Sequence, residues 1–259
     1  MSGDLEKSMS ESMEAHPEIL PYLPHLLSDM WALGSSPDKV IEMVRPLNLP
    51  AETTRVLDLG CGKGAVCIQL AKNFGFKVVG VDASEPFLAD ARTRAKQYSV
   101  DSRSKFLNAD IREFVKTARN YDLVILASLG GIFGGYKQTI EVLRSVIKSG
   151  GYMIIDDGFL RGEKPLQRPG YSHYLPHQAV IKGLTSFEDQ LISEVILTNE
   201  ENSAIDREYI GALKKRSIPL IKKQPELKKL IDKYIENQEV ECDIIENNLT
   251  GAIWLLRKQ

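Results

Sequence analysis

Three glycines spaced two apart, at positions 60, 62 and 64, directly follow a short apolar run at residues 55–59. The run is rich in Val and Leu without polar alternation, which is typical of a parallel strand buried on both faces. Glycines allow a sharp backbone turn and the close approach of a ligand where a Cβ would clash. Residues 65–74 then carry apolar side chains at helical spacing. The sequence therefore predicts a strand, a glycine turn and a helix in direct succession.

A second apolar run, residues 77–81, ends on Asp82. This acid lies about 20 residues beyond the glycines, where a carboxylate at the end of the second strand can accept hydrogen bonds from ribose hydroxyls. The alternative is an ordinary βαβ unit with a glycine turn and an N-cap aspartate, but strand, three glycines and acid in register favour a ligand site. The layout therefore favours a nucleoside-binding α/β domain.

The glycine spacing narrows the choice of nucleoside. In the G-x-G-x-x-G fingerprint of dinucleotide-binding domains, a pyrophosphate lies at the helix N-terminus. This chain has G-x-G-x-G instead, and Asp58 precedes the first glycine by two residues. A negative group there suits a cationic, phosphate-free ligand, so a nicotinamide-dependent oxidoreductase is the less favoured alternative.

The segment Val-Leu-Asp-Leu-Gly-Cys-Gly-Lys-Gly at residues 56–64 closely resembles motif I of the class I S-adenosylmethionine-dependent methyltransferases. The resemblance continues through residues 82–84, 108–111, 121–124 and 143–151. It implies S-adenosyl-L-methionine as the cofactor, a ligand with a sulfonium and an adenosine but no phosphate. It also implies an α/β, Rossmann-like fold: a doubly wound, seven-stranded, mostly parallel sheet with strand seven antiparallel and helices on both faces.

The resemblance implies that residues at the carboxyl ends of the strands bind the cofactor, and these ends share one edge of an open α/β sheet. The residues are Asp58, Gly60, Cys61, Gly62, Asp82, Ala83, Asp110, Ile111, Ala127 and Ser128. Among them, Asp58 is expected to face the amino group and Asp82 the ribose. Asp110 is expected to accept from the exocyclic amine of adenine.

The rest of the chain alternates between the two periodicities, which predicts a parallel sheet with right-handed crossovers. Strands are expected at 55–59, 77–81, 104–108, 121–126, 151–155, 190–197 and 252–256. Helices are expected at 63–74, 85–98, 111–117, 137–147 and 176–184.

Three parts are expected along the chain. Residues 1–50 form an N-terminal helical cap whose first fifteen residues are frayed. Residues 51–200 and 250–259 form the methyltransferase core. Residues 201–249 form a charged helical insertion on the substrate side, interrupted at Pro219 and Pro225.

Methyl transfer from a sulfonium needs little side-chain chemistry, because orientation in a dry pocket supplies up to ~7–11 kcal/mol of the barrier reduction. A general base is needed only where the acceptor is protonated. Tyr171, His173 and His177, in the segment after the fifth strand, are the candidate catalytic residues, and a packed loop is the alternative for them.

No metal is expected. Asp156 and Asp157 follow the fifth strand, where one branch of the resembled family binds magnesium. That branch also uses an aspartate after strand four, where this chain has Ala127 and Ser128.

A small-molecule acceptor is expected, and composition indicates no other kind of partner. The net charge is -2, no apolar run is long enough to span a membrane, and the three cysteines lack zinc-type spacing, so nucleic acid and membrane partners are not indicated. The polar first residues do not resemble a signal peptide, and a cytoplasmic protein with reduced thiols is expected. Two alternatives remain: an RNA or protein methyltransferase that docks through the basic stretch 214–233, and a cofactor-binding scaffold without activity.

Overall fold

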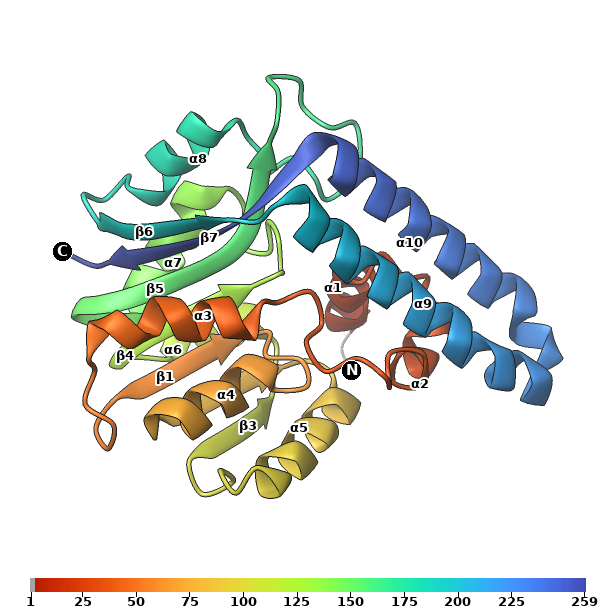
Figure 1. Ribbon diagram of the computed structural model, residues 1–259, viewed down its shortest axis with the longest axis horizontal. Coiled ribbons are helices and arrows are strands. Elements are labelled where there is room, and N and C mark those ends of the chain that lie inside the picture. The colour runs from red at the N-terminus through yellow and green to blue at the C-terminus, as the bar shows by residue number, and fades with distance from the viewer. Residues whose placement is uncertain (1–2) are drawn as a thin grey trace. The chain divides into compact units, whose positions relative to one another are not determined.

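The computed structural model describes residues 3–259 (Figure 1). Contacts divide them into two compact units. The sheet unit comprises residues 32–196 and 251–259, and the helical unit comprises residues up to 31 together with 197–250. Residues 32–50 of the expected N-terminal cap therefore cluster with the sheet, whereas the expected insertion shares a unit with the first 31 residues.

The sheet has seven strands in the order β3-β2-β1-β4-β5-β7-β6. They are β1 Arg55–Leu59, β2 Lys77–Asp82, β3 Ser104–Asn108, β4 Tyr121–Ala127, β5 Ile147–Leu160, β6 Gln190–Ile196 and β7 Leu249–Arg257. β1 pairs in parallel with β2 and with β4, and β6 pairs antiparallel with β7. This confirms the predicted fold class. The strand order reverses between β1 and β4, where open α/β sheets bind their ligands.

Helices cover both faces of the sheet (Figure 1). They are α3 Pro37–Val44 with the 3₁₀ turn η2 Arg45–Leu47, α4 Ala65–Phe74, α5 Glu85–Gln97, α6 Ile111–Thr117, α7 Tyr136–Val146 and α8 His177–Leu184. An apolar cluster lies under α6, α7 and α8 and joins them to the inward side chains of β1, β4, β5 and β7. Trp254 of β7 is fully buried in it.

The fifth strand is longer than expected, because it begins at Ile147 and ends at Leu160. Gly150, which precedes the strand expected at 151–155, and Gly151 both lie within β5. Their backbone groups bond Lys258, whose carbonyl accepts from Gly150 and whose N–H donates to Gly151. The strand continues through the two glycines because Lys258 provides hydrogen-bond partners for their backbone groups.

The helical unit contains α1 Gly3–Ser12, η1 Pro17–Tyr22, α2 Leu23–Leu26, α9 Asn199–Lys223, η3 Pro225–Leu227 and α10 Lys228–Asn248. The expectation of a frayed N-terminus was wrong for residues 3–12, which are helical. The expected break at Pro219 was also wrong, since α9 runs through it without that residue's N–H, whereas Pro225 starts η3. Within residues 3–259, none of the helices is both long and apolar enough to cross a bilayer.

Polar groups tie α9 to α10. The Tyr209 hydroxyl lies 3.0 Å from that of Tyr234 and donates to Gln238 Oε1 at 2.6 Å. Thr198 and Glu201 form a capping box that starts α9.

Candidate functional site

The glycine turn forms a left-handed corner between β1 and α4. Gly60, Gly62 and Gly64 have φ of 71°, 50° and 72°, a conformation that only glycine adopts without strain. The N–H groups of Gly60 and Cys61 both donate to the carbonyl of Val81, at 2.8 and 3.1 Å. The corner is thereby attached to the end of β2, the strand that carries Asp82.

Asp82 is held at this corner by backbone donors. Its Oδ2 accepts from the Gly62 N–H at 2.8 Å, and its Oδ1 accepts from the Ser84 N–H at 2.8 Å. Burial raises the pKa of this carboxyl, and the backbone donors oppose that effect. Each carboxylate oxygen has a further lone pair, so the group is oriented and still able to accept from two hydroxyls.

Asp58 is a buried carboxylate at the end of β1, only 2% exposed. It accepts a hydrogen bond from the Cys67 thiol at 3.1 Å. Among residues 3–259, no basic side chain forms an ion pair with it, and burial raises its pKa to about 6. A buried charge without a partner is costly, so a cationic ligand group is favoured beside it.

Asp110 caps α6, and its carboxylate also contacts a basic side chain. It accepts from the Arg112 N–H at 2.9 Å, and the Arg112 guanidinium contacts both of its oxygens, which lowers the pKa of the carboxyl. An adenine amine at this place would share the carboxylate with Arg112. Ile111 is buried at the start of α6, and the Ala83 carbonyl accepts from the Asn108 amide at 2.8 Å.

The end of β4 meets a segment from before α3. After Ala127, Ser128 is left-handed with φ of 55°, and its N–H donates to the Asp156 carbonyl at 2.8 Å. A Cβ on Gly34 would lie 3.3 Å from the Ser128 side chain. The Ser36 N–H donates to Asp156 Oδ2 at 3.2 Å. Residues 32–36 therefore lie over the strand ends.

Two leucines that sequence reasoning missed cover the glycine corner. A Cβ on Gly60 would lie 2.3 Å from Leu129 Cδ1, and a Cβ on Gly62 would lie 3.2 Å from Leu33 Cδ1. Leu129 follows β4 and Leu33 precedes α3. No local pattern marks either residue, because only the fold brings them to the corner.

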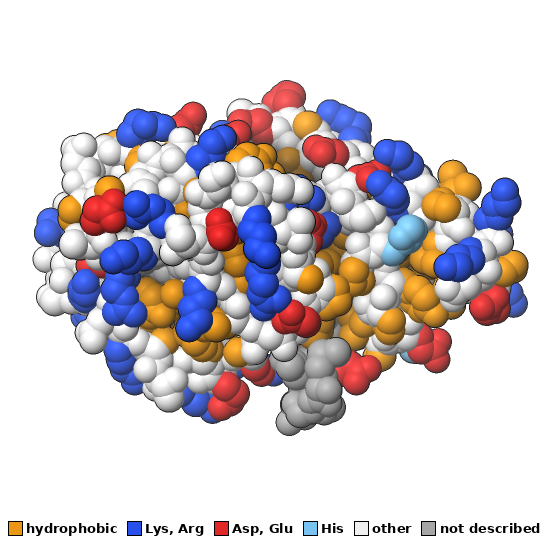
Figure 2. All heavy atoms as spheres, turned by 90° about the horizontal axis from the view of Figure 1, so that it is seen from below, with side chains coloured by type: hydrophobic (Ala, Val, Ile, Leu, Met, Phe, Trp, Pro, Cys, Tyr) orange, Lys and Arg blue, Asp and Glu red, His pale blue; other side chains and the backbone are white. Residues whose placement is uncertain are grey.

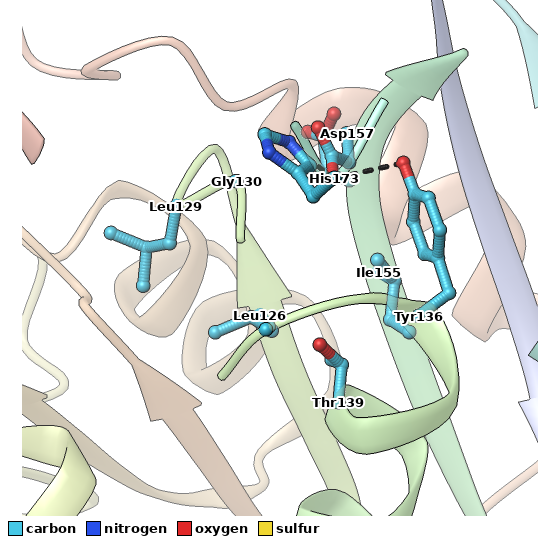
Figure 3. Close-up of a pocket in the computed structure, with 10 residues that line it drawn as sticks. Leu126, Leu129, Gly130, Tyr136, Thr139, Ile155, Asp157 and His173 are labelled. Atoms are coloured by element: carbon cyan, nitrogen blue, oxygen red, sulfur yellow. Dashed lines mark hydrogen bonds and ion pairs between the residues drawn. The ribbon is translucent and has the colours of Figure 1, made fainter. Parts of the chain in front are cut away.

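A pocket adjoins Leu129 at the ends of β4 and β5 (Figure 3). Its volume open to a water-sized molecule is about 10 Å³, room for about one water. It is lined by Leu126, Leu129, Gly130, Gly134, Tyr136, Thr139, Ile155, Asp156, Asp157 and His173. Of the three predicted catalytic residues, only His173 is among them.

The other two candidates lie elsewhere. His177 begins α8, with its Nε2 2.7 Å from Glu194 Oε1 on β6, and the indole N–H of Trp254 donates to the same oxygen. Tyr171 is buried, and its ring centroid lies 5.3 Å from that of Tyr174. The structure instead brings Asp157 and Tyr136 next to His173.

Asp156 and Asp157 are both engaged by hydrogen-bond donors. Asp156 accepts from Ser36, and burial raises its pKa to about 7. The Tyr136 hydroxyl lies 3.1 Å from Asp157 Oδ2. In the described part of the chain, no group of three or more His, Cys, Asp or Glu side chains is arranged to hold a metal ion.

The strand order and the glycine corner together define a Rossmann-like methyltransferase fold of class I. The family described as "Methyltransferase domain" matches residues 50–233, most of the chain. The protein therefore belongs to this family of class I S-adenosylmethionine-dependent methyltransferases.

Three relatives illustrate the similarity. A SAM-dependent methyltransferase of Geobacter sulfurreducens, solved in complex with S-adenosyl-L-homocysteine, superimposes with a TM-score of 0.76 at 20% identity over 98% of both chains. YjhP of Escherichia coli (strain K12), an uncharacterised protein, is 32% identical over 108 residues, 42% of this chain and 43% of YjhP. The ubiquinone biosynthesis O-methyltransferase of Bartonella quintana (strain Toulouse) is 27% identical over 173 residues, 61% of this chain and 70% of that protein. The matched segment thus spans less than half of YjhP.

Proposed function

We propose that the protein transfers the methyl group of S-adenosyl-L-methionine to a small-molecule acceptor by in-line displacement. The observation that carries this proposal is the pairing, at one sheet edge, of an oriented acceptor of hydroxyl groups with an uncompensated buried carboxylate. Asp82 is fixed by two backbone donors, and Asp58 has no cation among the described residues. A ribose and an ammonium group are the complementary partners.

The remaining cofactor contacts are proposed from position. Gly60, Cys61 and Gly62 would bring backbone close to the methionine portion. Ala83, Asp110 and Ile111 would surround the adenine, and Ala127 and Ser128 would offer a carbonyl to the ammonium. Bound there, the cofactor would supply an electrophilic methyl group whose leaving group is a neutral thioether.

The protein's own task is to position the acceptor and exclude water. Leu33 and Leu129 lie on the corner where the methionine portion would enter, so both side chains must move aside when the cofactor binds. Once displaced, two leucines beside the sulfur would keep the site dry, and a dry site strengthens the electrostatic interactions within it.

A small-molecule acceptor agrees with the state of the basic stretch. Of the eight Lys and Arg residues at 214–233, five pair with acids of the helical unit: Lys214, Lys215, Arg216, Lys228 and Lys233. On the face that Figure 2 shows, basic side chains lie among acidic and apolar ones. A nucleic-acid surface needs unpaired, clustered cations.

Calorimetry with S-adenosyl-L-methionine and S-adenosyl-L-homocysteine tests the proposal first, and both should bind. Incubation of the protein with methyl-labelled cofactor and a metabolite extract should then label a small molecule. Binding without any labelled product would favour a scaffold, and label found only in RNA or protein would exclude a small-molecule acceptor.

A further inference from the structure

The His173 ring is held on several sides. Its Nδ1 lies 2.9 Å from the Gly170 carbonyl, and its centroid lies 4.0 Å from that of Tyr174. Cβ atoms on Gly130 and Gly131 would each lie 3.0 Å from the imidazole side chain, so the two glycines make room for it. The side chain is 8% exposed.

The hydrogen bond to Gly170 determines where the proton is. A carbonyl oxygen only accepts, so Nδ1 must be the donor, and in the neutral ring the lone pair then lies on Nε2. Nε2 is buried and has no hydrogen-bond partner among residues 3–259. The nearest acid is Asp157, whose Oδ2 lies 3.6 Å away. A buried, unpaired acceptor therefore lies among the residues that line the pocket.

Next to His173, two acceptors compete for the single proton of one hydroxyl group. The Tyr136 hydroxyl lies 3.1 Å from Asp157 Oδ2 and 2.5 Å from the Gly158 carbonyl, yet it has only one hydrogen for two acceptors. Burial raises the pKa of Tyr136, so this hydroxyl stays protonated and does not gain a charge. A proton taken up at Nε2 would make His173 an ion-pair partner of Asp157.

The pocket offers mainly acceptors to a ligand. Asp156, Asp157 and His173 Nε2 are acceptors, and only Thr139 and Tyr136 carry hydroxyls. Figure 3 shows His173 beside Asp157, with the Tyr136 hydroxyl joined to Asp157 by a hydrogen bond and Leu129 on the other side of His173. Leu129 lines the same pocket and lies against Gly60, so the pocket adjoins the corner proposed for the methionine portion.

We infer that His173 is the general base for a methyl acceptor that arrives carrying a proton, a hydroxyl or an amine, and that Asp157, which contacts Tyr136, stabilises the imidazolium that forms. The inference deepens the proposed function and rests on it. The acceptor's O–H or N–H bond breaks and its proton passes to Nε2. The oxygen or nitrogen forms the new bond to carbon, and the carbon–sulfur bond breaks with its electron pair left on sulfur.

The first test needs no acceptor. Long-range ¹H–¹⁵N spectra of the ¹⁵N-labelled full chain, with H173Q used to assign the signals, should show His173 protonated at Nδ1 and bare at Nε2. D157N should shift the ¹⁵N signals of this imidazole, because the carboxylate 3.6 Å from Nε2 loses its charge. Asp156 and Tyr136 are the other titratable groups that line the pocket, so D156N and Y136F are measured alongside. A proton on Nε2, or ¹⁵N signals of His173 that are unchanged in D157N, would overturn the inference.

The second test uses methyl-labelled cofactor with four probes: catechol, 4-nitrocatechol, phenethylamine and thioanisole. Labelling of catechol or phenethylamine is expected, and these two separate the hydroxyl from the amine source. H173Q should lower kcat/KM for the labelled probe by about 100-fold or more, with the affinity for S-adenosyl-L-homocysteine unchanged. At mildly alkaline pH, 4-nitrocatechol is largely ionised and needs no base. H173Q should therefore lower kcat/KM less for 4-nitrocatechol than for the labelled probe.

The control is H25Q, which replaces an exposed histidine of the helical unit. Equal rates for H173Q and H25Q, labelling of thioanisole alone, or labelling of none of the proton-bearing probes would count against the inference. Failure of wild-type protein to bind S-adenosyl-L-homocysteine would instead reject the proposed function, and the NMR result on His173 would stand separately.

Discussion

The charge on Asp58 lowers the stability of the folded state but is expected to favour ligand binding. The pKa of Asp58 is raised from 3.8 to about 6 by burial, so the folded state binds a proton more tightly than the unfolded state does. Stability therefore falls as the pH rises from about 4 to about 6, and at neutral pH the charged carboxylate costs about 1–3 kcal/mol. The same charge is what the proposed site offers to a ligand ammonium.

Asp58→Asn should separate these two effects. An amide oxygen can still accept from Cys67, so the variant should raise the free energy of unfolding at neutral pH by about 1–3 kcal/mol. It should also weaken binding of S-adenosyl-L-homocysteine, because the counter-charge is lost. Urea unfolding and calorimetry measure the two. At about pH 4, wild-type Asp58 is protonated and the gain should vanish; a gain of equal size there would contradict this account.

Asp82→Ala should weaken binding of S-adenosyl-L-homocysteine at least about tenfold, since two hydroxyl contacts to a charged acceptor are lost. The variant also leaves the Gly62 and Ser84 N–H groups without their acceptor. Calorimetry measures the change, with Glu85→Ala as the control because that acid is exposed and pairs with Arg92. Unchanged affinity in Asp82→Ala would remove the ribose assignment.

At the scale of elements, the sequence predicted the bounds of those helices and strands whose ends are determined by neighbouring residues. The bounds of β1, β3 and α6 were predicted to the residue, because turn residues or a capping aspartate end each apolar run. β5 was misjudged because the partners of Gly150 and Gly151 lie more than a hundred residues away at Lys258.

The same distinction applies to the candidate site. The glycine corner and Asp82 lie within one βαβ unit, so their pattern is visible in the sequence. The pocket instead assembles Leu129, Tyr136, Asp157 and His173 from the β4–α7 loop, α7, β5 and the loop after β5. No spacing rule links residues on four such segments. His173 could be singled out by its chemistry alone, but its partners depend on packing.

The joint between β1 and α4 depends on Gly64. Gly64→Ala would need φ of 72°, and its Cβ would lie 2.8 Å from Phe106 and 3.0 Å from Ala91. Left-handed backbone and overpacking together should lower the free energy of unfolding by about 2–4 kcal/mol. Gly162→Ala is the matched control, since nothing lies within 4 Å of its Cβ. Urea denaturation compares them, and equal stability of the two variants would contradict the packing described here.

At the scale of the whole molecule, ligand binding is expected to stabilise only the unit that contains the site. All residues proposed to contact the cofactor belong to the sheet unit. A ligand that binds only the folded state stabilises it by about 2.7 kcal/mol at 100 times its Kd. Hydrogen exchange with S-adenosyl-L-homocysteine should therefore show added protection in the sheet unit, most of all at the strands whose ends bind the ligand.

The size of this protection should depend on pH with a definite sign. As the pH falls through about 6, Asp58 takes up a proton and no longer attracts the ligand ammonium, so Kd rises and the protection shrinks. By linkage, the bound cation should in turn lower the pKa of Asp58, which moves the loss to lower pH at higher ligand concentration. Exchange at saturating ligand across about pH 5–8 measures this. Asp58→Asn removes the titrating group, so the weaker protection of this variant by the ligand should vary much less over the same pH range. If the variant instead shows the same pH dependence as the wild type, another group causes the effect, and Asp156 is the first to examine.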